Sequence, residues 1–351
     1  MKILFFINQL YGGGAERVAT TLLNHFCEKH DTYVAVLDFN NIPYPLDTRV
    51  TIINDRIKSK IKGASRIPRF LKMAHTIKKI NPDIVISFIT QTNVRALAAS
   101  LLTHKKIIVS ERNSLNRKIP TKEIILRKLL YPFANKIVFV SAEDSRKFNR
   151  PQKSLVIYNP ATFEPYSNYD NREKSIATIG PNKRWRQKGL DILMEAWEKI
   201  AEHNPNWNLE IYGRISDIVL PDSIAHKKQT RVSWNGWCEN IAEILRSKSI
   251  FVLASRFEGC PNSLIEAMSQ GCACLATNCD GGSKEIIDDG VNGLIAISED
   301  ADDIATKLQM LIDNEELRRR LSAGAILKMK QFDKNAFFAK WDKLIEDVAG
   351  K

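Results

Sequence analysis

Short runs of β-branched and aromatic residues alternate with longer amphipathic stretches along the whole chain, and this alternation restricts the fold more than any other feature. The amphipathic stretches repeat their apolar residues three and four positions apart, which is the period of a helix. Strands are predicted at 2–8, 32–38, 51–53, 84–88, 106–110, 137–140 and 154–158, and again at 176–179, 208–213, 231–235, 250–254, 273–277 and 293–297. Such alternation is typical of βαβ units, whose strands are parallel. The sequence therefore predicts an α/β fold.

Prolines and turn-forming residues interrupt this alternation over residues 159–171. The interruption separates two α/β series of about equal size, and 351 residues exceed the ~250–300 at which a single hydrophobic core usually stops growing. We therefore expect two doubly wound, Rossmann-like domains, at 1–165 and 166–333. Ligands of such domains bind outside the carboxyl ends of the strands, so a cleft between the domains is the expected active site.

Positive charge is concentrated in the first half of the chain. Residues 1–150 carry 26 Lys and Arg against 11 Asp and Glu, a net charge of +15, whereas residues 151–351 carry 26 against 29, a net charge of −3. No apolar run reaches the ~18 residues of a membrane-spanning helix, and no signal-peptide cleavage site follows the first apolar run. The six cysteines match neither a zinc site nor a redox motif. These features predict a cytoplasmic protein with reduced thiols.

Three consecutive glycines, Gly12 to Gly14, lie between the first predicted strand and a helical pattern. Glycine lets the backbone approach a ligand closely, and the N-terminus of a helix offers unpaired N–H groups to an anion. The spacing matches neither the dinucleotide fingerprint nor a Walker loop. Gly13 and Gly14 are therefore candidates for binding a phosphate, and a tight turn without a ligand is the alternative.

A second loop combines glycine with positive charge directly after the first strand of the second series. It carries Lys183, Arg184, Arg186 and Lys188. Doubly wound domains bind their ligands at this point, and guanidinium and ammonium groups suit a diphosphate. A solvated basic loop is the alternative.

The most informative segment is residues 255–266. The strand predicted at 250–254 leads into a loop with Glu258 and Gly259, and a helix that starts at Pro261 and Asn262 carries Glu266 about one turn in. Two carboxylates so placed can accept paired hydrogen bonds from hydroxyl groups at opposite ends of a ligand whose diphosphate lies at the helix N-terminus. In the alternative interpretation, Glu266 is an ordinary surface residue of that helix.

These residues resemble glycosyltransferase family 4. The resemblance rests on 258–266, on the following Ala-Met-Ser-Gln-Gly-Cys-Ala at 267–273, on 280–294, on Gly-Gly-x-Glu-Arg at 13–17 and on the Arg/Lys-Gly loop, and so covers essentially the entire chain. Members are retaining sugar transferases with the GT-B fold. The resemblance implies that 1–165 binds the acceptor, that 166–333 binds a nucleotide-sugar, and that a helix within 334–351 crosses back onto the N-terminal domain.

The resemblance also implies roles for individual residues. Glu258 would contact the hydroxyls of the donor sugar, and Glu266 would hold the ribose diol. Lys188 and Arg184 would bind the diphosphate, and with Glu258 they form the expected catalytic group. The other residues implied on the donor side are Gly13, Gly14, Trp237, Gly259, Asn262, Ser263 and Leu264.

Two departures from the family pattern leave assignments open. The loop from 180 to 188 is about two residues longer than usual, so Lys183, Arg184 and Arg186 compete for the role of the arginine. A histidine often follows the strand at 106–110 in the family, whereas this chain has Glu111, Arg112 and Asn113 there. These three are candidates for the acceptor side.

Chemistry and charge together suggest the cofactors and partners. We expect no metal cofactor, because no Asp-x-Asp or His/carboxylate cluster suits Mg²⁺ or Mn²⁺ and the cations can stabilise the departing diphosphate. Residues 49–79 contain ten Lys and Arg against one Asp, interleaved with apolar residues. Such a stretch fits the surface of an anionic membrane, or else a solvated helix face. The expected partners are a UDP-sugar carrying a hexose or N-acetylhexosamine, a lipid-linked glycan acceptor and the inner face of the cytoplasmic membrane, where the protein would be peripheral.

Two other functions compete with sugar transfer. A sugar-nucleotide epimerase or hydrolase on the same scaffold would turn over the donor without an acceptor. A nucleic-acid-binding protein could use the charge of the first half, but the basic stretch lacks interleaved stacking aromatics and no recognition module is visible. No nucleic-acid partner is therefore expected.

Overall fold

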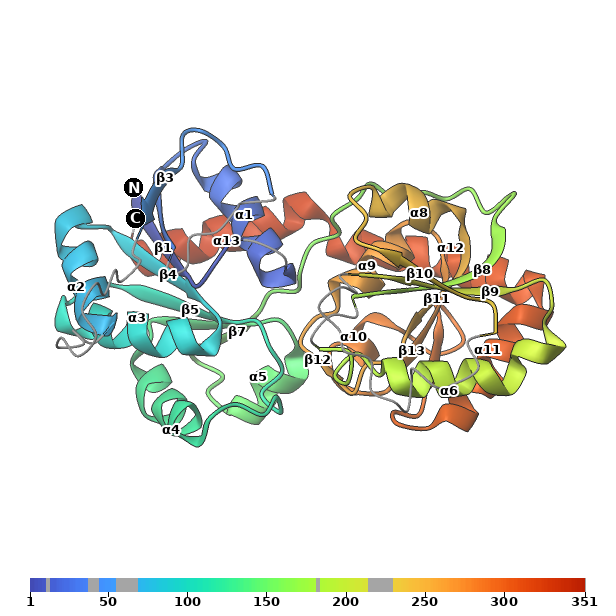
Figure 1. The fold of residues 1–351 in the computed structure, drawn as a ribbon. Coiled ribbons are helices and arrows are strands. Elements are labelled where there is room, and N and C mark those ends of the chain that lie inside the picture. Colours follow the sequence, from blue (N-terminus) through green and yellow to red (C-terminus); the bar gives the residue numbers. More distant parts are fainter. Residues whose placement is uncertain (11–12, 37–43, 55–68, 181–183, 214–229, 351) are drawn as a thin grey trace. The chain divides into compact units, whose positions relative to one another are not determined.

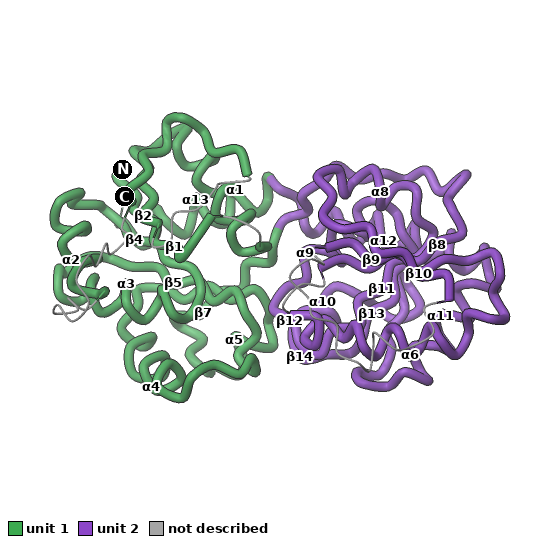
Figure 2. The backbone as a smooth tube through the Cα atoms, viewed as in Figure 1, with its two compact units in different colours: residues 1–159, 335–351 green, residues 160–334 purple. Residues whose placement is uncertain are grey.

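The computed structural model describes residues 1–350 except 11–12, 37–43, 55–68, 181–183 and 214–229. The chain packs into two compact units (Figure 2). Unit 1 consists of residues 1–159 and 335–351, and unit 2 consists of residues 160–334. The basic stretch at 49–79 lies largely outside the described residues, since only its two ends, 49–54 and 69–79, are described.

Unit 1 is built on a seven-stranded sheet in the order β3-β2-β1-β4-β5-β6-β7, with every pair parallel (Figure 1). Its strands are β1 (Lys2–Ile7), β2 (Asp31–Val36), β3 (Thr51–Asn54), β4 (Ile84–Phe88), β5 (Ile107–Glu111), β6 (Lys136–Phe139) and β7 (Ser154–Val156). Its helices are α1 (Gly14–Phe26), α2 (Arg69–Ile80), α3 (Thr90–Leu102), α4 (Thr121–Leu130), η1 (Tyr131–Phe133), α5 (Ala142–Phe148) and α13 (Lys334–Ala349).

Helices cover both faces of this sheet. Along β1, Ile3, Phe5 and Ile7 belong to the core under α1 and α13, whereas Leu4 and Phe6 belong to the core under α2 and α3. All five side chains are fully buried. A strand buried on both faces gives a continuous apolar run instead of an alternating one, which is the pattern that the sequence shows at 3–7.

Unit 2 repeats this plan with a six-stranded parallel sheet in the order β10-β9-β8-β11-β13-β15. Its strands are β8 (Glu173–Ile179), β9 (Asn208–Tyr212), β10 (Val232–Gly236), β11 (Lys248–Leu253), β13 (Ala273–Thr277) and β15 (Leu294–Ala296), with a separate pair β12 (Phe257–Glu258) and β14 (Asp280–Gly281). Its helices are α6 (Leu190–Ile200), η2 (Ala201–His203), α8 (Ile241–Ser247), α9 (Asn262–Ser269), α10 (Ser283–Ile286), α11 (Ala301–Asp313), α12 (Glu315–Met329) and η4 (Lys330–Phe332).

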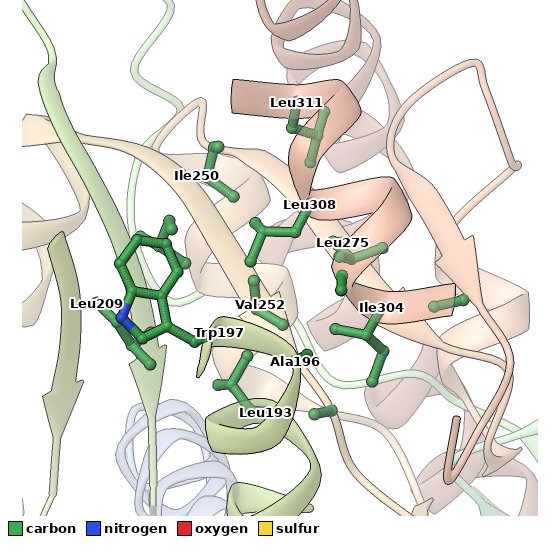
Figure 3. Close-up of a cluster of buried hydrophobic side chains, with 14 of the residues drawn as sticks. Leu193, Ala196, Trp197, Leu209, Ile250, Val252, Leu275, Ile304, Leu308 and Leu311 are labelled. Carbon is green, nitrogen blue, oxygen red and sulfur yellow. The ribbon is translucent and has the colours of Figure 1, made fainter. Parts of the chain in front are cut away.

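A hydrophobic core of unit 2 lies between its sheet and the helices α6 and α11 (Figure 3). Trp197 of α6 is buried there against Leu209, and its indole N–H donates a hydrogen bond of 2.8 Å to the carbonyl of Thr230. Burying the ring while pairing its single polar group is the favourable way to place a tryptophan in a core. On the same side, α11 contributes Ile304 and Leu308.

The predicted α/β fold of two doubly wound units is confirmed, and each predicted strand has a counterpart within a few residues. Helix α6 begins at Leu190, directly after Gly189, whose backbone is left-handed. The short pair β12 and β14 was not predicted, since two residues are too few to show a period. In the described part of the chain, no helix is both long and apolar enough to span a bilayer.

Candidate functional site

The strand order of unit 2 reverses between β8 and β11, and two loops leave the sheet there. One runs from Gly180 to Gly189 after β8, and the other follows β11 from Ala254 to Pro261. Doubly wound sheets bind ligands at such a switch point, at the carboxyl ends of the strands. The cation loop and the carboxylate loop predicted from sequence therefore lie at the same edge of one sheet.

The structure joins these loops through a charged pair. The ammonium group of Lys188 lies 2.7 Å from Oε1 of Glu258, and the hydroxyl of Ser255 donates to the same oxygen at 2.8 Å. Glu258 is 8% exposed, whereas the side chain of Lys188 is 21% exposed. The partly exposed ammonium group can therefore reach a ligand while its charge stabilises the buried carboxylate.

Glycines allow the backbone around Glu258 to pack closely. The strand β14 pairs with β12, so that Gly281 lies opposite Glu258. A Cβ atom at Gly281, where φ is +107°, would lie 1.6 Å from the carbonyl oxygen of Glu258. The next residue, Gly282, donates a backbone hydrogen bond of 2.9 Å to the carbonyl of Gly259. The Gly-Gly pair thus fixes the backbone that carries Glu258.

An arginine in the second loop connects it to α6. Two guanidinium N–H groups of Arg256 donate to the carboxylate of Asp191 at 2.8 and 2.9 Å, and a third donates to Glu299 at 2.8 Å. Its backbone N–H donates to the carbonyl of Gln187, next to Lys188, at 2.8 Å. These bonds hold the two loops in register, and paired Arg–carboxylate bonds are both strong and directional.

The helix α9 begins directly after the second loop. Ser263, at its second position, is 8% exposed, and its hydroxyl has no hydrogen-bond partner among the residues that the structure describes. Glu266 is 4% exposed and accepts a hydrogen bond of 3.4 Å from the hydroxyl of Thr162. The interpretation of Glu266 as an ordinary surface residue is therefore wrong. The start of α9 combines a helix N-terminus with a buried hydroxyl, and both suit an anion.

The remaining donor-side predictions are distributed around this edge. Arg184 and Arg186 are exposed, and the Arg186 guanidinium lies 5.7 Å from the centre of the Trp185 ring. Lys183 lies outside the described residues. Trp237 is 48% exposed and directly follows β10. Gly259 and Leu264 are buried beside Glu258 and Ser263.

In unit 1, the equivalent edge holds the other predicted residues. Gly13 is the N-cap of α1 and Gly14 its first residue, directly after the loop that follows β1. The strand order reverses between β1 and β4, and β4 is followed by Ile89, whose φ of 74° is unusual for a β-branched residue. Strained backbone of this kind is common at functional sites.

Glu111 lies at the end of the next strand, β5, in a buried polar network. It is 1% exposed, and its carboxylate accepts hydrogen bonds from the hydroxyls of Thr90, at 2.8 and 2.9 Å, and Tyr131, at 2.8 Å. The Tyr131 hydroxyl accepts in turn from Asn93 at 2.9 Å. Burial raises the pKa of Glu111, and the two hydroxyls and the charge of Arg127 oppose that rise. These contacts favour a positioning role for Glu111 over direct contact with a ligand.

The neighbouring candidates have different surroundings. The guanidinium of Arg112 lies 4.9 Å from the centre of the Phe88 ring and donates to the side chain of Asn159. Asn113 is half-buried, and its amide oxygen accepts a hydrogen bond of 2.8 Å from Arg117. Both residues therefore have fixed side chains at the carboxyl end of β5.

The raised pKa of Glu111 gives a pH-dependent prediction. A carboxyl whose pKa is higher in the folded state than its ordinary 4.5 contributes stability below that pH, and loses it as the pH rises through the folded-state pKa. Replacing Glu111 by Gln removes this titration. We expect the free energy of unfolding of E111Q, relative to wild type, to increase as the pH rises above about 4.5. Urea denaturation at a series of pH values measures this difference.

The alanine variant serves as the control. Like E111Q, Glu111→Ala removes the titration, so its free energy of unfolding relative to wild type should change with pH in the same direction. Because it also leaves the hydroxyls of Thr90 and Tyr131 without their acceptor, it should be less stable than E111Q by about 2–4 kcal/mol at every pH. If the difference in free energy of unfolding between E111Q and wild type stays constant with pH, the assigned direction of the pKa shift is contradicted.

Sequence reasoning missed three contributors to the site. The first is Ser255, because a serine in a loop carries no sequence signal for such a contact. The second is Arg256, whose partners Asp191 and Glu299 lie far away in the sequence. The third is the Gly281–Gly282 pair. Two adjacent glycines a few residues after the buried strand β13 are the signal for a close backbone approach. Among the described residues, no three His, Cys, Asp or Glu side chains gather as metal ligands.

Two doubly wound units, each with a parallel sheet, are the architecture of the GT-B fold. Comparison with known families gives the assignment. The family model described as Glycosyltransferase Family 4 matches residues 12–163, and the one described as Glycosyl transferases group 1 matches residues 173–314. Between them they span most of both units. The chain belongs to glycosyltransferase family 4 and is a glycosyltransferase.

The relatives of this chain include bacterial glycosyltransferases whose names state the sugar that they transfer. It is 26% identical, over 99% of both chains, to the GalNAc-α-(1→4)-GalNAc-α-(1→3)-diNAcBac-PP-undecaprenol α-1,4-N-acetyl-D-galactosaminyltransferase of Campylobacter jejuni. It is 27% identical to the lipopolysaccharide 1,6-galactosyltransferase of Salmonella typhimurium, over 55% of this chain and 57% of the relative.

Solved structures share the fold. HepE of Anabaena, crystallised with UDP and glucose, has a TM-score of 0.82 at 18% identity, covering 99% of this chain and 100% of that one. The lipopolysaccharide outer core galactosyltransferase WaaB in its apo form has a TM-score of 0.74 at 22% identity, covering 99% of both chains. The GT-B fold predicted from the sequence is confirmed.

Proposed function

We propose that this protein transfers a hexose or N-acetylhexosamine from a UDP-sugar to a lipid-linked glycan, with retention of the anomeric configuration and without a metal cofactor. One observation supports the donor site above all: the ammonium group of Lys188 lies 2.7 Å from the carboxylate of Glu258 at the switch point of unit 2. A carboxylate suits sugar hydroxyls, and a cation suits the diphosphate that leaves.

The chemistry requires positive charge at the departing diphosphate. The bond between the anomeric carbon and the diphosphate oxygen breaks, the acceptor oxygen bonds to that carbon on the same face, and the acceptor's proton passes to a phosphate oxygen. Lys188 and Arg184 in the loop after β8, together with the N-terminus of α9 and Ser263, would stabilise the charge that develops. Glu266, buried on α9, would hold the ribose diol, and Trp237 the base.

The acceptor is inferred from relatives and from charge. The Campylobacter relative acts, by its name, on a glycan attached to undecaprenol through a diphosphate. Residues 1–150 carry a net charge of +15, which suits an anionic acceptor at a membrane. We assign the acceptor to unit 1, with Arg112 and Asn113 on its side and Glu111 positioning them, and the protein to the inner face of the cytoplasmic membrane. Polysaccharide, lipopolysaccharide or O-antigen synthesis would use this reaction.

A donor screen tests the proposal. UDP-sugars and GDP-sugars are added to the wild-type protein and to Glu258→Ala, and the thermal midpoint and nucleotide release are measured. A UDP-sugar at about 100 times its Kd should stabilise the wild type by about 2.7 kcal/mol. In E258A, the sugar contacts are lost. A UDP-sugar should therefore stabilise this variant little more than UDP alone does.

The matched control is Glu316→Ala, which removes an exposed carboxylate of α12 in the same unit. It should respond to donors like the wild type. If no nucleotide-sugar stabilises the wild type more than E258A, the donor site is wrongly assigned. Nucleotide release at full rate without any glycan acceptor would instead indicate a hydrolase or an epimerase.

A further inference from the structure

Helix α4 of unit 1 turns charged side chains inward and apolar side chains outward, the reverse of an ordinary surface helix. Its charged residues Glu123 and Arg127 are buried, at 4% and 8% exposure. Its apolar residues Ile125, Leu126 and Leu129 are 51%, 41% and 61% exposed, and Phe133 in the following turn η1 is 62% exposed. A surface helix of a globular protein normally turns its apolar side inward and its charges outward.

The buried charges have counterparts inside unit 1. Burial raises the pKa of Glu111, and the charge of Arg127 is among the groups that oppose this rise. Burial and Arg69 lower the pKa of Arg95, which lies on α3, and the charge of Glu123 opposes that fall. Helix α4 packs beside α3 (Figure 1). Because Glu123 and Arg127 are buried, this side of α4 faces the interior of unit 1, and this orientation leaves the apolar side exposed.

The exposed apolar residues form one surface, which we call the α4 face and define as Ile125, Leu126, Leu129 and Phe133. Ile125 and Leu129 are four residues apart on α4 and so lie on one side of the helix, and Phe133 is exposed in the turn η1 that follows directly. Monomeric proteins rarely expose a contiguous apolar patch unless it binds something.

Cations border the α4 face. Lys122 and Lys128 are exposed and lie three residues before and three residues after Ile125 on the same helix. The half of the chain that contains them has a net charge of +15. An apolar ridge bordered by lysines is the composition of a segment that lies in the interface of an anionic bilayer. A protein partner with an apolar surface would account for the ridge and leave the lysines unexplained.

We propose that the α4 face is a membrane-docking surface, whose apolar side chains enter the headgroup region of an anionic bilayer while Lys122 and Lys128 contact lipid phosphates. This inference rests on the proposed function in one respect: a lipid-linked acceptor is held in the membrane, so the enzyme must bind at the membrane surface to reach it. This membrane contact is separate from the one expected for the basic stretch at 49–79, because it lies on α4 and is made mainly by apolar side chains.

Vesicle co-sedimentation of the full-length protein tests this proposal. The vesicles are of phosphatidylcholine alone, or of phosphatidylcholine with about 30% phosphatidylglycerol. We expect L129Q/F133Q to lower the partition coefficient on anionic vesicles about tenfold or more. The variant K122Q/K128Q should lower it by a similar factor on anionic vesicles and little on neutral ones, because each cation acts through surface charge.

The matched control is M310Q/L327Q. It replaces apolar side chains of unit 2 that are 49% and 63% exposed, so it removes a similar exposed apolar surface at another place. Its partition should stay within about twofold of the wild type. The change in thermal midpoint caused by UDP-sugar, measured without vesicles, should be the same in all variants, because their substitutions avoid the proposed donor site.

Three results would overturn the proposal: a wild type that does not sediment with anionic vesicles, an L129Q/F133Q variant that sediments like the wild type, or a wild-type dimer that L129Q/F133Q converts to a monomer. The last result would identify the α4 face as a contact between copies of the chain. Failure of the proposed sugar transfer is recognised separately, by the absence of any stabilisation of the wild type by nucleotide-sugars.

Discussion

Replacing Lys188 by methionine is expected to lower kcat/KM for sugar transfer by about 10²–10³-fold, because the proposed mechanism uses this cation to stabilise the departing diphosphate as it gains charge. Methionine retains most of the length of the side chain, so the loss reports charge more than packing. Part of the effect should appear in kcat, since the interaction becomes stronger as negative charge develops in the transition state. Steady-state kinetics with saturating acceptor measure it.

The variant has a second effect that must be separated from the first. Lys188 neutralises Glu258, which is 8% exposed, and removing one partner of a buried pair leaves an uncompensated charge. The double variant K188M/E258Q removes both charges and should recover most of the stability lost in K188M. It should recover none of the activity. Urea denaturation and kinetics on the same preparations distinguish the two effects.

A lysine of the same unit provides the control. Lys199, on α6, pairs with Asp302 at the surface, where a salt bridge contributes little. Lys199→Met should therefore change kcat/KM less than about twofold. A K188M enzyme that keeps more than a third of the wild-type activity would show that Lys188 does not stabilise the leaving group.

The fold could be predicted because its signal is local. The strand at 3–7 is apolar throughout because both of its faces are buried, and the same holds for 250–253. Each run identifies a strand without knowledge of its neighbours. The position of the site followed from topology, since the carboxyl ends of strands flanking a switch point carry the ligand. Lys188 and Glu258 could thus be placed at one edge from the sequence.

Their contact could not be predicted in the same way. Lys188 and Glu258 are 70 residues apart in the sequence, and only the packing of two loops brings the ammonium group to 2.7 Å from the carboxylate. Arg256 also binds residues that are far away in the sequence, since Asp191 is 65 residues and Glu299 is 43 residues from it. The burial of Glu266 could not be predicted from the sequence either, because a glutamate one turn into a helix has the same local pattern whether it faces solvent or the protein.

Replacing Gly281 by alanine is the substitution with the largest expected effect on stability and activity together. The backbone there has φ of +107°, which an L-residue adopts with strain, and the new Cβ would lie 1.6 Å from the carbonyl oxygen of Glu258. Because the clash is with backbone, it cannot be relieved by rotating a side chain. We expect the free energy of unfolding to fall by about 3 kcal/mol or more.

The same change should lower kcat/KM by about 10²-fold or more in the molecules that remain folded, because β12 must move away from β14 and carries Glu258 with it. Gly290→Ala is the matched control: φ is +73° there, but no atom lies within 4 Å of the new Cβ. It should cost about 1–2 kcal/mol through backbone strain and leave kcat/KM unchanged. Equal losses of activity in the two variants would mean that backbone strain in general, and not the contact with Glu258, determines the activity. A loss confined to G281A ties the position of one carboxylate to a glycine 23 residues further along the chain.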